Sequence, residues 1–112
     1  MIMRFDNYYV NSIKEGIKTS TILKNFLAEV GDTIRVTSDK GPFAFQGNFG
    51  FIKIREIKYI RFGDIDKEIA MTEGYLHEDL LKADLNMIYD DLEDSDLLYY
   101  ILFEFKENEE DF

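Results

Sequence analysis

The stretch Gly16-Ile17-Lys18-Thr19-Ser20-Thr21-Ile22 decides the fold, together with Gly31-Asp32-Thr33-Ile34-Arg35-Val36 further along the chain. In the first stretch, Gly16 ends a short amphipathic helix that begins near Asp6, and the Thr- and Ile-rich run from 18 to 23 has the composition of a β-strand. In the second, a Gly-Asp turn precedes the apolar-polar alternation of a half-buried strand. Polar groups gathered at such a bend add little to packing, so we interpret the first stretch as a site.

The run from 51 to 62 predicts a long strand that contains an irregularity. Its apolar residues share one parity up to Ile54 and the opposite parity from Ile57 onward. Such a phase change is produced by a β-bulge, which we expect near Arg55 and Glu56. Because bulges bend strands, this one favours a sheet that curves into a small barrel.

Two helices and a last strand are predicted in the second half of the chain. The helices span 64–73 and 77–91, and a strand with clear alternation follows over 99–106. The second helix has an apolar stripe of four residues: Leu81, Leu85, Ile88 and Leu92. Strands interrupted by helices without a regular alternation predict a single α+β domain over 1–106, followed by an acidic tail over 107–112.

The composition excludes several classes of protein. At 112 residues the chain has room for one core, and it has no Cys for disulfides or cysteine-ligated zinc. No apolar run approaches the roughly 20 residues that span a bilayer, so we expect a cytoplasmic protein without a membrane partner. We expect no cofactor and no metal, since the acidic residues between 90 and 96 lack the glycine and the spacing of a calcium loop. A monomer or weak dimer is expected.

Charge is distributed unevenly along the chain, whose net charge is -10. Residues 1–62 hold 10 Lys and Arg against 6 Asp and Glu, whereas residues 63–112 hold 3 against 17. Long nucleic acids are held largely through their phosphates, so long DNA is an unfavourable partner. A small nucleoside or modified base is compatible with this charge, and so is a basic protein.

The segment 41–50 combines glycines and the only proline with several phenylalanines. Turn residues at this density predict a loop. Two interpretations of its aromatic residues stay open: a lid over a pocket, or a loop packed onto the core.

Glu73 is a carboxylate that we predict to face the protein interior. Ile69 and Ala70 precede it by four and three residues, so the three side chains share one helix face. Burial of a carboxylate is costly unless it is paired, and desolvation raises its pKa toward the range useful for proton transfer. It is interpreted either as an acid or base in a site, or as a helix-end carboxylate bound by a neighbouring loop.

Read together with Ala70-Met71-Thr72-Glu73-Gly74-Tyr75, these motifs resemble those of the ASCH domains of the PUA-like superfamily. They are most similar to the small bacterial N4-acetylcytidine amidohydrolases. That family has a helix, Gly-x-Lys-Thr-x-Thr-Ile, Gly-Asp-x-x-Arg-Val, a later Ala-x-x-Glu and a final Tyr-x-x-x-Phe strand in this order. The resemblance runs from about Phe5 to Phe105. It implies a small PUA-like mixed β-barrel with flanking helices.

The resemblance also implies catalytic residues, because Lys18, Thr21 and Glu73 match the catalytic group of the amidohydrolases. In the implied mechanism, neutral Lys18 takes the proton of Thr21, Thr21 attacks the acyl carbonyl, and Glu73 protonates the leaving amine. Lys18 and Thr21 have opposite parity along a regular strand, so they converge only if the chain bends between them. Four further residues are expected to bind the substrate: Thr19, Ser20, Arg35 and Tyr75.

Three functions stay open. The first is an amidohydrolase that removes the acetyl group of N4-acetylcytidine-type nucleosides. The second is a non-catalytic ASCH module that binds a modified base, a nucleotide or RNA, and Leu23 favours it because the amidohydrolases carry Arg at that position. The third is an acidic interaction protein of mobile-element origin, which the charge of residues 63–112 favours.

Overall fold

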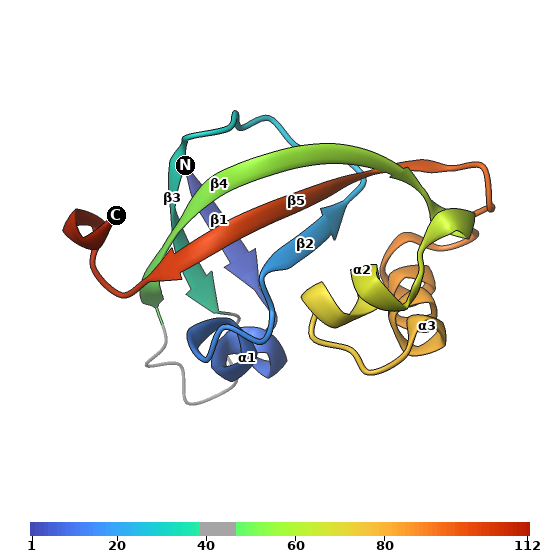
Figure 1. Ribbon diagram of the computed structural model, residues 1–112, viewed down its shortest axis with the longest axis horizontal. Helices are drawn as coiled ribbons and strands as arrows, with labels where there is room; N and C mark the ends of the chain where they lie inside the picture. Colours follow the sequence, from blue (N-terminus) through green and yellow to red (C-terminus); the bar gives the residue numbers. More distant parts are fainter. Residues whose placement is uncertain (39–46) are drawn as a thin grey trace.

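One mixed sheet organises the molecule, and helices are grouped around it (Figure 1). The computed structural model describes residues 1–38 and 47–112. The sheet has five strands in the order β1-β3-β4-β5-β2. Their bounds are β1 Ile2–Phe5, β2 Ser20–Leu23, β3 Thr33–Ser38, β4 Asn48–Arg61 and β5 Leu97–Lys106.

Strand pairing is mixed. β1 pairs with β3 in parallel, and the β3–β4, β4–β5 and β5–β2 pairs are antiparallel. The α+β class is therefore confirmed. β1 and β2 are the two edges and are not paired with each other, so the described strands form an open sheet and do not close the expected barrel.

β4 and β5 are the long central strands, and they carry the predicted bulge. Their register shifts between Ile54 and Glu56, which leaves Arg55 as the extra residue. The bulge moves Ile57 into register with Ile101, a fully buried residue of β5. Since a bulge increases the local bend of a strand, it accounts for the curved ribbon of β4 in Figure 1.

The expected helices are present, but those predicted over 64–73 and 77–91 are shorter, at Lys67–Thr72 and Glu78–Tyr89. The 3-10 turn η1 (Asn7–Tyr9) leads into α1 (Val10–Lys14), and the Asp6 side chain accepts a hydrogen bond from Tyr8 N at 2.8 Å. Gly16 follows with φ +75°, a conformation that suits glycine. After η2 (Phe62–Asp64) come α2 (Lys67–Thr72) and α3 (Glu78–Tyr89), which lie side by side at one end of the sheet in Figure 1.

Two apolar clusters form the core. One lies between α1 and the central strands and includes Ile13, Ile34, Ile54 and Ile101. The other joins β2 and β5 to α2 and α3, with Ile22, Ala70, Leu81, Leu85 and Leu98 among its members. The second cluster fixes α2 and α3 against β2, and this places the end of α2 beside the Lys18 segment.

Several expectations need correction. β1 was not anticipated, because four residues are too few to show a period. Ile88 is 62% exposed, so the buried face of α3 is narrower than the predicted stripe. Asn48–Gly50 of the predicted loop belong to β4, while its residues 41–46 lie outside the described residues. The tail contains one 3-10 turn, η3 (Glu109–Asp111). Within the described chain, no helix is both long and apolar enough to cross a membrane.

Candidate active site

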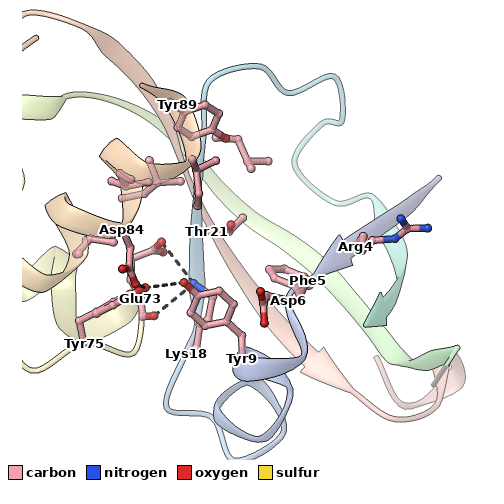
Figure 2. Close-up of a pocket in the computed structure, with 15 residues that line it drawn as sticks. Arg4, Phe5, Asp6, Tyr9, Lys18, Thr21, Glu73, Tyr75, Asp84 and Tyr89 are labelled. Atoms are coloured by element: carbon pink, nitrogen blue, oxygen red, sulfur yellow. Dashed lines mark hydrogen bonds and ion pairs between the residues drawn. The ribbon is translucent and has the colours of Figure 1, made fainter. Parts of the chain in front are cut away.

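A cavity of about 350 Å³ opens between β2, η1 and the helices α2 and α3 (Figure 2). Its wall includes the polar side chains of Tyr9, Lys18, Thr21, Glu73, Tyr75 and Asp84. They come from the segment before β2, from β2 itself, from η1, from the end of α2 and from α3. The volume lies within the range of about 300–1,000 Å³ typical of small-molecule pockets.

A turn after α1 places Lys18. The backbone N–H groups of Ile17 and Lys18 both donate to the Ser12 carbonyl, at 2.9 and 3.0 Å, and Thr19 N donates to the Thr72 carbonyl at 2.7 Å. β2 begins only at Ser20, so Lys18 lies outside the regular strand. The parity that would have separated Lys18 from Thr21 therefore does not apply, and both side chains line the cavity.

The end of α2 places Glu73. It is the C-terminal cap of that helix, and Gly74 turns the chain away with φ +89°. A Cβ atom at Gly74 would lie 3.5 Å from the Lys18 Cβ, so the two segments are in close contact there. The Glu73 residue is 3% exposed, which confirms the inward orientation expected from its helix face.

Lys18 and Glu73 form a buried ion pair. Lys18 Nζ lies 3.4 Å from Glu73 Oε1 and donates to the Glu73 carbonyl oxygen at 3.3 Å. The other carboxylate oxygen, Oε2, accepts a hydrogen bond from Ser20 Oγ. Ser20 in turn contacts the Thr72 hydroxyl at 2.7 Å, and Thr72 contacts the Tyr100 hydroxyl at 2.6 Å.

Burial changes the proton affinity of both partners in opposite directions. Desolvation lowers the pKa of Lys18, although the charge of Glu73 opposes this. Desolvation likewise raises the pKa of Glu73, against the effect of Lys18 and of the Ser20 hydrogen bond. Both directions favour a neutral amine beside a protonated carboxyl. That state contains the same number of protons as the ion pair, so it is reached by moving one proton from Lys18 to Glu73.

Known proteins match this chain by structure. No family model matches the sequence, and no curated protein matches it either. An ASCH domain from Lactobacillus crispatus JV V101 superposes with a TM-score of 0.70 at 16% identity, over 88% of this chain and 70% of that one. The chain has the ASCH fold.

Two further solved structures support this assignment. Protein EF3133 from Enterococcus faecalis V583, of family DUF984, gives a TM-score of 0.74 at 15% identity, over 89% of this chain and 68% of its own. Hypothetical protein PH0355 gives 0.67 at 18% identity, over 94% and 97%. At such low identities the comparison establishes the ASCH fold alone.

On the ASCH fold, four of the predicted site residues meet at the cavity: Lys18, Thr21, Glu73 and Tyr75. Thr21 is 7% exposed and lies on the β2 wall, apart from the Lys18–Glu73 pair in Figure 2. Leu23, at the position where the resembling amidohydrolases carry Arg, lines the same cavity.

Three other predicted residues lie elsewhere. Ser20 is fully buried behind the cavity wall, where it binds Glu73. Thr19 lines a smaller hollow beside Phe103. Arg35 is exposed on β3, with its guanidinium 5.7 Å from the Phe51 ring centre, in a hollow separate from the cavity.

Two residues of the site were missed. Tyr9 was not named among the site residues, yet its ring centre lies 4.8 Å from Lys18 Nζ. Asp84 lies in the cavity wall and accepts a hydrogen bond from the Tyr75 hydroxyl. Asp84 follows Leu81 by three residues and precedes Ile88 by four, so it is a carboxylate on the apolar stripe. The reasoning applied to Glu73 would have identified it.

A metal centre finds no support in the described part of the chain, since no three His, Asp or Glu side chains there gather closely enough to hold an ion. Lys18 Nζ, the carboxyl of Glu73 and the Thr21 hydroxyl are the groups available for chemistry. Together they can supply a base, an acid and a nucleophile.

Proposed function

We propose that this protein is an amidohydrolase that removes the acetyl group from N4-acetylcytidine or a closely similar acylated nucleoside. The observation that carries the proposal is the buried Lys18–Glu73 pair, which faces a cavity that also contains the hydroxyl of Thr21. A buried pair with this protonation behaviour adds little to folding stability, because desolvation offsets the attraction between the charges. A role in proton transfer would explain why the Lys18–Glu73 pair is buried beside the cavity.

Acylation would begin from the neutral form of the pair. The Lys18 amine accepts the Thr21 hydroxyl proton while Thr21 Oγ bonds to the acyl carbon. The bond from that carbon to N4 breaks, and protonated Glu73 gives its proton to the departing nitrogen. Cytidine leaves, the acetyl group remains on Thr21, and Lys18 and Glu73 are left as the ion pair.

Deacylation would restore the starting state. Water attacks the Thr21 ester and gives one proton to the Glu73 carboxylate. The released Thr21 oxygen recovers a proton from the Lys18 ammonium, and acetic acid leaves. In each step one member of the pair gains a proton and the other loses one, so the pair alternates between its neutral and ionised forms. Burial shifts the two pKa values in opposite directions, which favours access to the neutral form.

Ser20 would hold Glu73 through both steps. When Glu73 is ionised, Ser20 Oγ donates to Oε2. When Glu73 is protonated, the carboxyl can donate to Ser20, which can then donate to Thr72 2.7 Å away. The hydroxyl thus serves either protonation state without movement of the chain.

A second function is favoured by one observation. Leu23 on the cavity wall offers no charge to hold a substrate, unlike the Arg of the resembling enzymes. This supports a non-catalytic module that binds a modified base, a nucleoside or an RNA end in the same cavity.

Hydrolysis of N4-acetylcytidine separates the two functions. Cytidine release is followed by chromatography for the wild type and for Lys18→Ala, Thr21→Ala and Glu73→Gln, with Arg55→Ala as a control at an exposed ion pair. We expect turnover in the wild type and in the control, and a loss of at least about a hundredfold in each site variant. Nucleoside binding without turnover in the wild type would establish the binding module instead.

A further inference from the structure

Three side chains from separate elements form a hydrogen-bonded chain in the cavity wall. The Tyr75 hydroxyl, between α2 and α3, donates to Asp84 Oδ2 on α3. The Tyr75 oxygen also lies 2.5 Å from the hydroxyl oxygen of Tyr9 on η1. All three residues line the cavity, and Figure 2 shows them beside Lys18 and Glu73. The proposed mechanism does not use these hydrogen bonds between Tyr9, Tyr75 and Asp84.

The direction of both hydrogen bonds follows from a count of protons. A phenol has one proton, and a carboxylate only accepts. Tyr75 gives its proton to Asp84, so it has none left for Tyr9. Tyr9 must therefore donate to Tyr75. Burial raises the pKa of both phenols above the usual range, so both keep these protons at neutral pH.

The result is a Tyr9 oxygen with no proton to offer to a ligand. Its remaining lone pair makes it an acceptor. The ring is held firmly, since the Tyr8 ring packs edge-on at 5.3 Å and Lys18 Nζ lies 4.8 Å from its centre. A ligand group that approaches Lys18 and Glu73 therefore meets a fixed acceptor.

We propose that Tyr9 determines specificity by accepting a hydrogen bond from an N–H group of the ligand, with Tyr75 and Asp84 as positioning residues that fix its direction. The identity of that N–H rests on the proposed function: in an acylated cytidine it is the N4–H of the amide. The Tyr9 oxygen then favours a ligand with a secondary amide or an exocyclic amine beside it over a ligand with a carbonyl oxygen at that position.

Cytidine and uridine provide a pair of probes of nearly the same shape. They differ at position 4, in an amine or a carbonyl, and at N3, which accepts a hydrogen bond in cytidine and donates one in uridine. Binding of each is measured by calorimetry. We expect the wild type to bind cytidine at least about tenfold more tightly than uridine. Tyr9→Phe is expected to reduce this preference to less than about threefold. Tyr89→Phe, whose hydroxyl also borders the cavity but binds Lys24 N, is expected to retain it.

Two further variants test the direction of the chain. Tyr75→Phe releases the Tyr9 proton, and Asp84→Asn allows an amide to donate to Tyr75 and reverse both bonds. Each is expected to narrow the preference mainly by improving uridine binding. A merely structural role would weaken both ligands equally, and that result would overturn the inference. Circular dichroism confirms folding, and either variant suffices if Tyr9→Phe does not fold.

Failure of this inference is distinguishable from failure of the proposed function. Turnover of N4-acetylcytidine together with an unchanged preference in Tyr9→Phe overturns the inference alone. If the preference for cytidine over uridine depends on Tyr9 but N4-acetylcytidine is not hydrolysed, the amidohydrolase proposal alone is overturned and the inference is supported. Absence of both turnover and binding in the wild type overturns both.

Discussion

Two ion pairs in this molecule each join a basic side chain to a glutamate, but one is buried and the other is exposed. The side chains of Lys18 and Glu73 are each 4% exposed, whereas those of Arg55 and Glu104, across β4 and β5, are 49% and 41% exposed. The pKa of Glu104 is lowered, chiefly by its hydrogen bond to Arg55, while burial raises the pKa of Glu73 despite Lys18. Loss of solvent therefore has a larger effect on the pKa of Glu73 than the nearby Lys18 has.

The largest effect is expected when one partner of the buried pair is removed. Lys18→Met leaves the buried Glu73 carboxyl without its ionic partner, which should cost about 3 kcal/mol of the free energy of unfolding. Urea unfolding at pH 7 measures this. A loss below about 1 kcal/mol would mean that the Lys18 segment yields and lets water reach Glu73.

Removal of both partners should restore most of that loss. Lys18→Met with Glu73→Leu replaces the pair by apolar side chains, and we expect a recovery of about 2 kcal/mol or more over Lys18→Met alone. The same urea measurement applies. Additive losses in the double variant would show that Lys18 and Glu73 contribute independently.

The difference in stability between the double variant and the wild type is expected to depend on pH. The raised pKa of Glu73 contributes stability below its usual value of 4.5 that is lost as the pH rises through the folded value. The lowered pKa of Lys18 contributes stability above 10.5 that is lost as the pH falls through its folded value. The pair is therefore least favourable between these limits. The double variant should gain most over the wild type near neutral pH, as unfolding curves from pH 4 to pH 10 would show.

A smaller effect is expected at Ser20. Ser20→Ala removes the donor to Glu73 and the partner of Thr72, and leaving buried groups unsatisfied should cost about 1.5 kcal/mol. If the enzyme is as proposed, kcat should fall with KM nearly unchanged. Thr19→Ala, one position earlier and facing a different hollow, is the matched control. Equal losses in both variants would contradict a specific role for Ser20.

The smallest effect is expected at the exposed pair. Arg55→Met leaves Glu104 in water and beside Lys106, whose Nζ lies 3.7 Å from Glu104 Oε1. The midpoint of urea unfolding should shift by no more than the error of the measurement. A shift as large as that of Lys18→Met would remove the contrast between the two pairs.

Sequence patterns were sufficient wherever one local rule decided the structure. The parity change around Arg55 identified the bulge, and the helix face of Glu73 identified its burial. Patterns failed where a partner distant in sequence decided the outcome. β1 forms because residues 2–5 pair with residues 35–38, and the sequence of these four residues does not predict that pairing.

The site shows the same division. Lys18, Thr21 and Glu73 were named from the motifs they match, and the structure brings them to one cavity. Ser20 could not be distinguished from Thr19 by sequence, because neighbouring hydroxyls look alike until one of them faces a carboxylate. Arg35 matched a motif as well as Lys18 did, but its strand turns it toward Phe51.

The strand order has a consequence for how the protein is made. Among the described strands β2 pairs only with β5, the last of them, and Lys18 contacts Glu73, 55 residues away in sequence. During synthesis from the N-terminus, β2 has no strand partner until β5 has emerged, and we therefore expect both groups to remain hydrated until then. Contacts this distant form slowly, because the intervening chain must lose entropy before they are made. Dehydration of the two charges thus belongs to the late part of folding, when the rest of the molecule can already compensate for it.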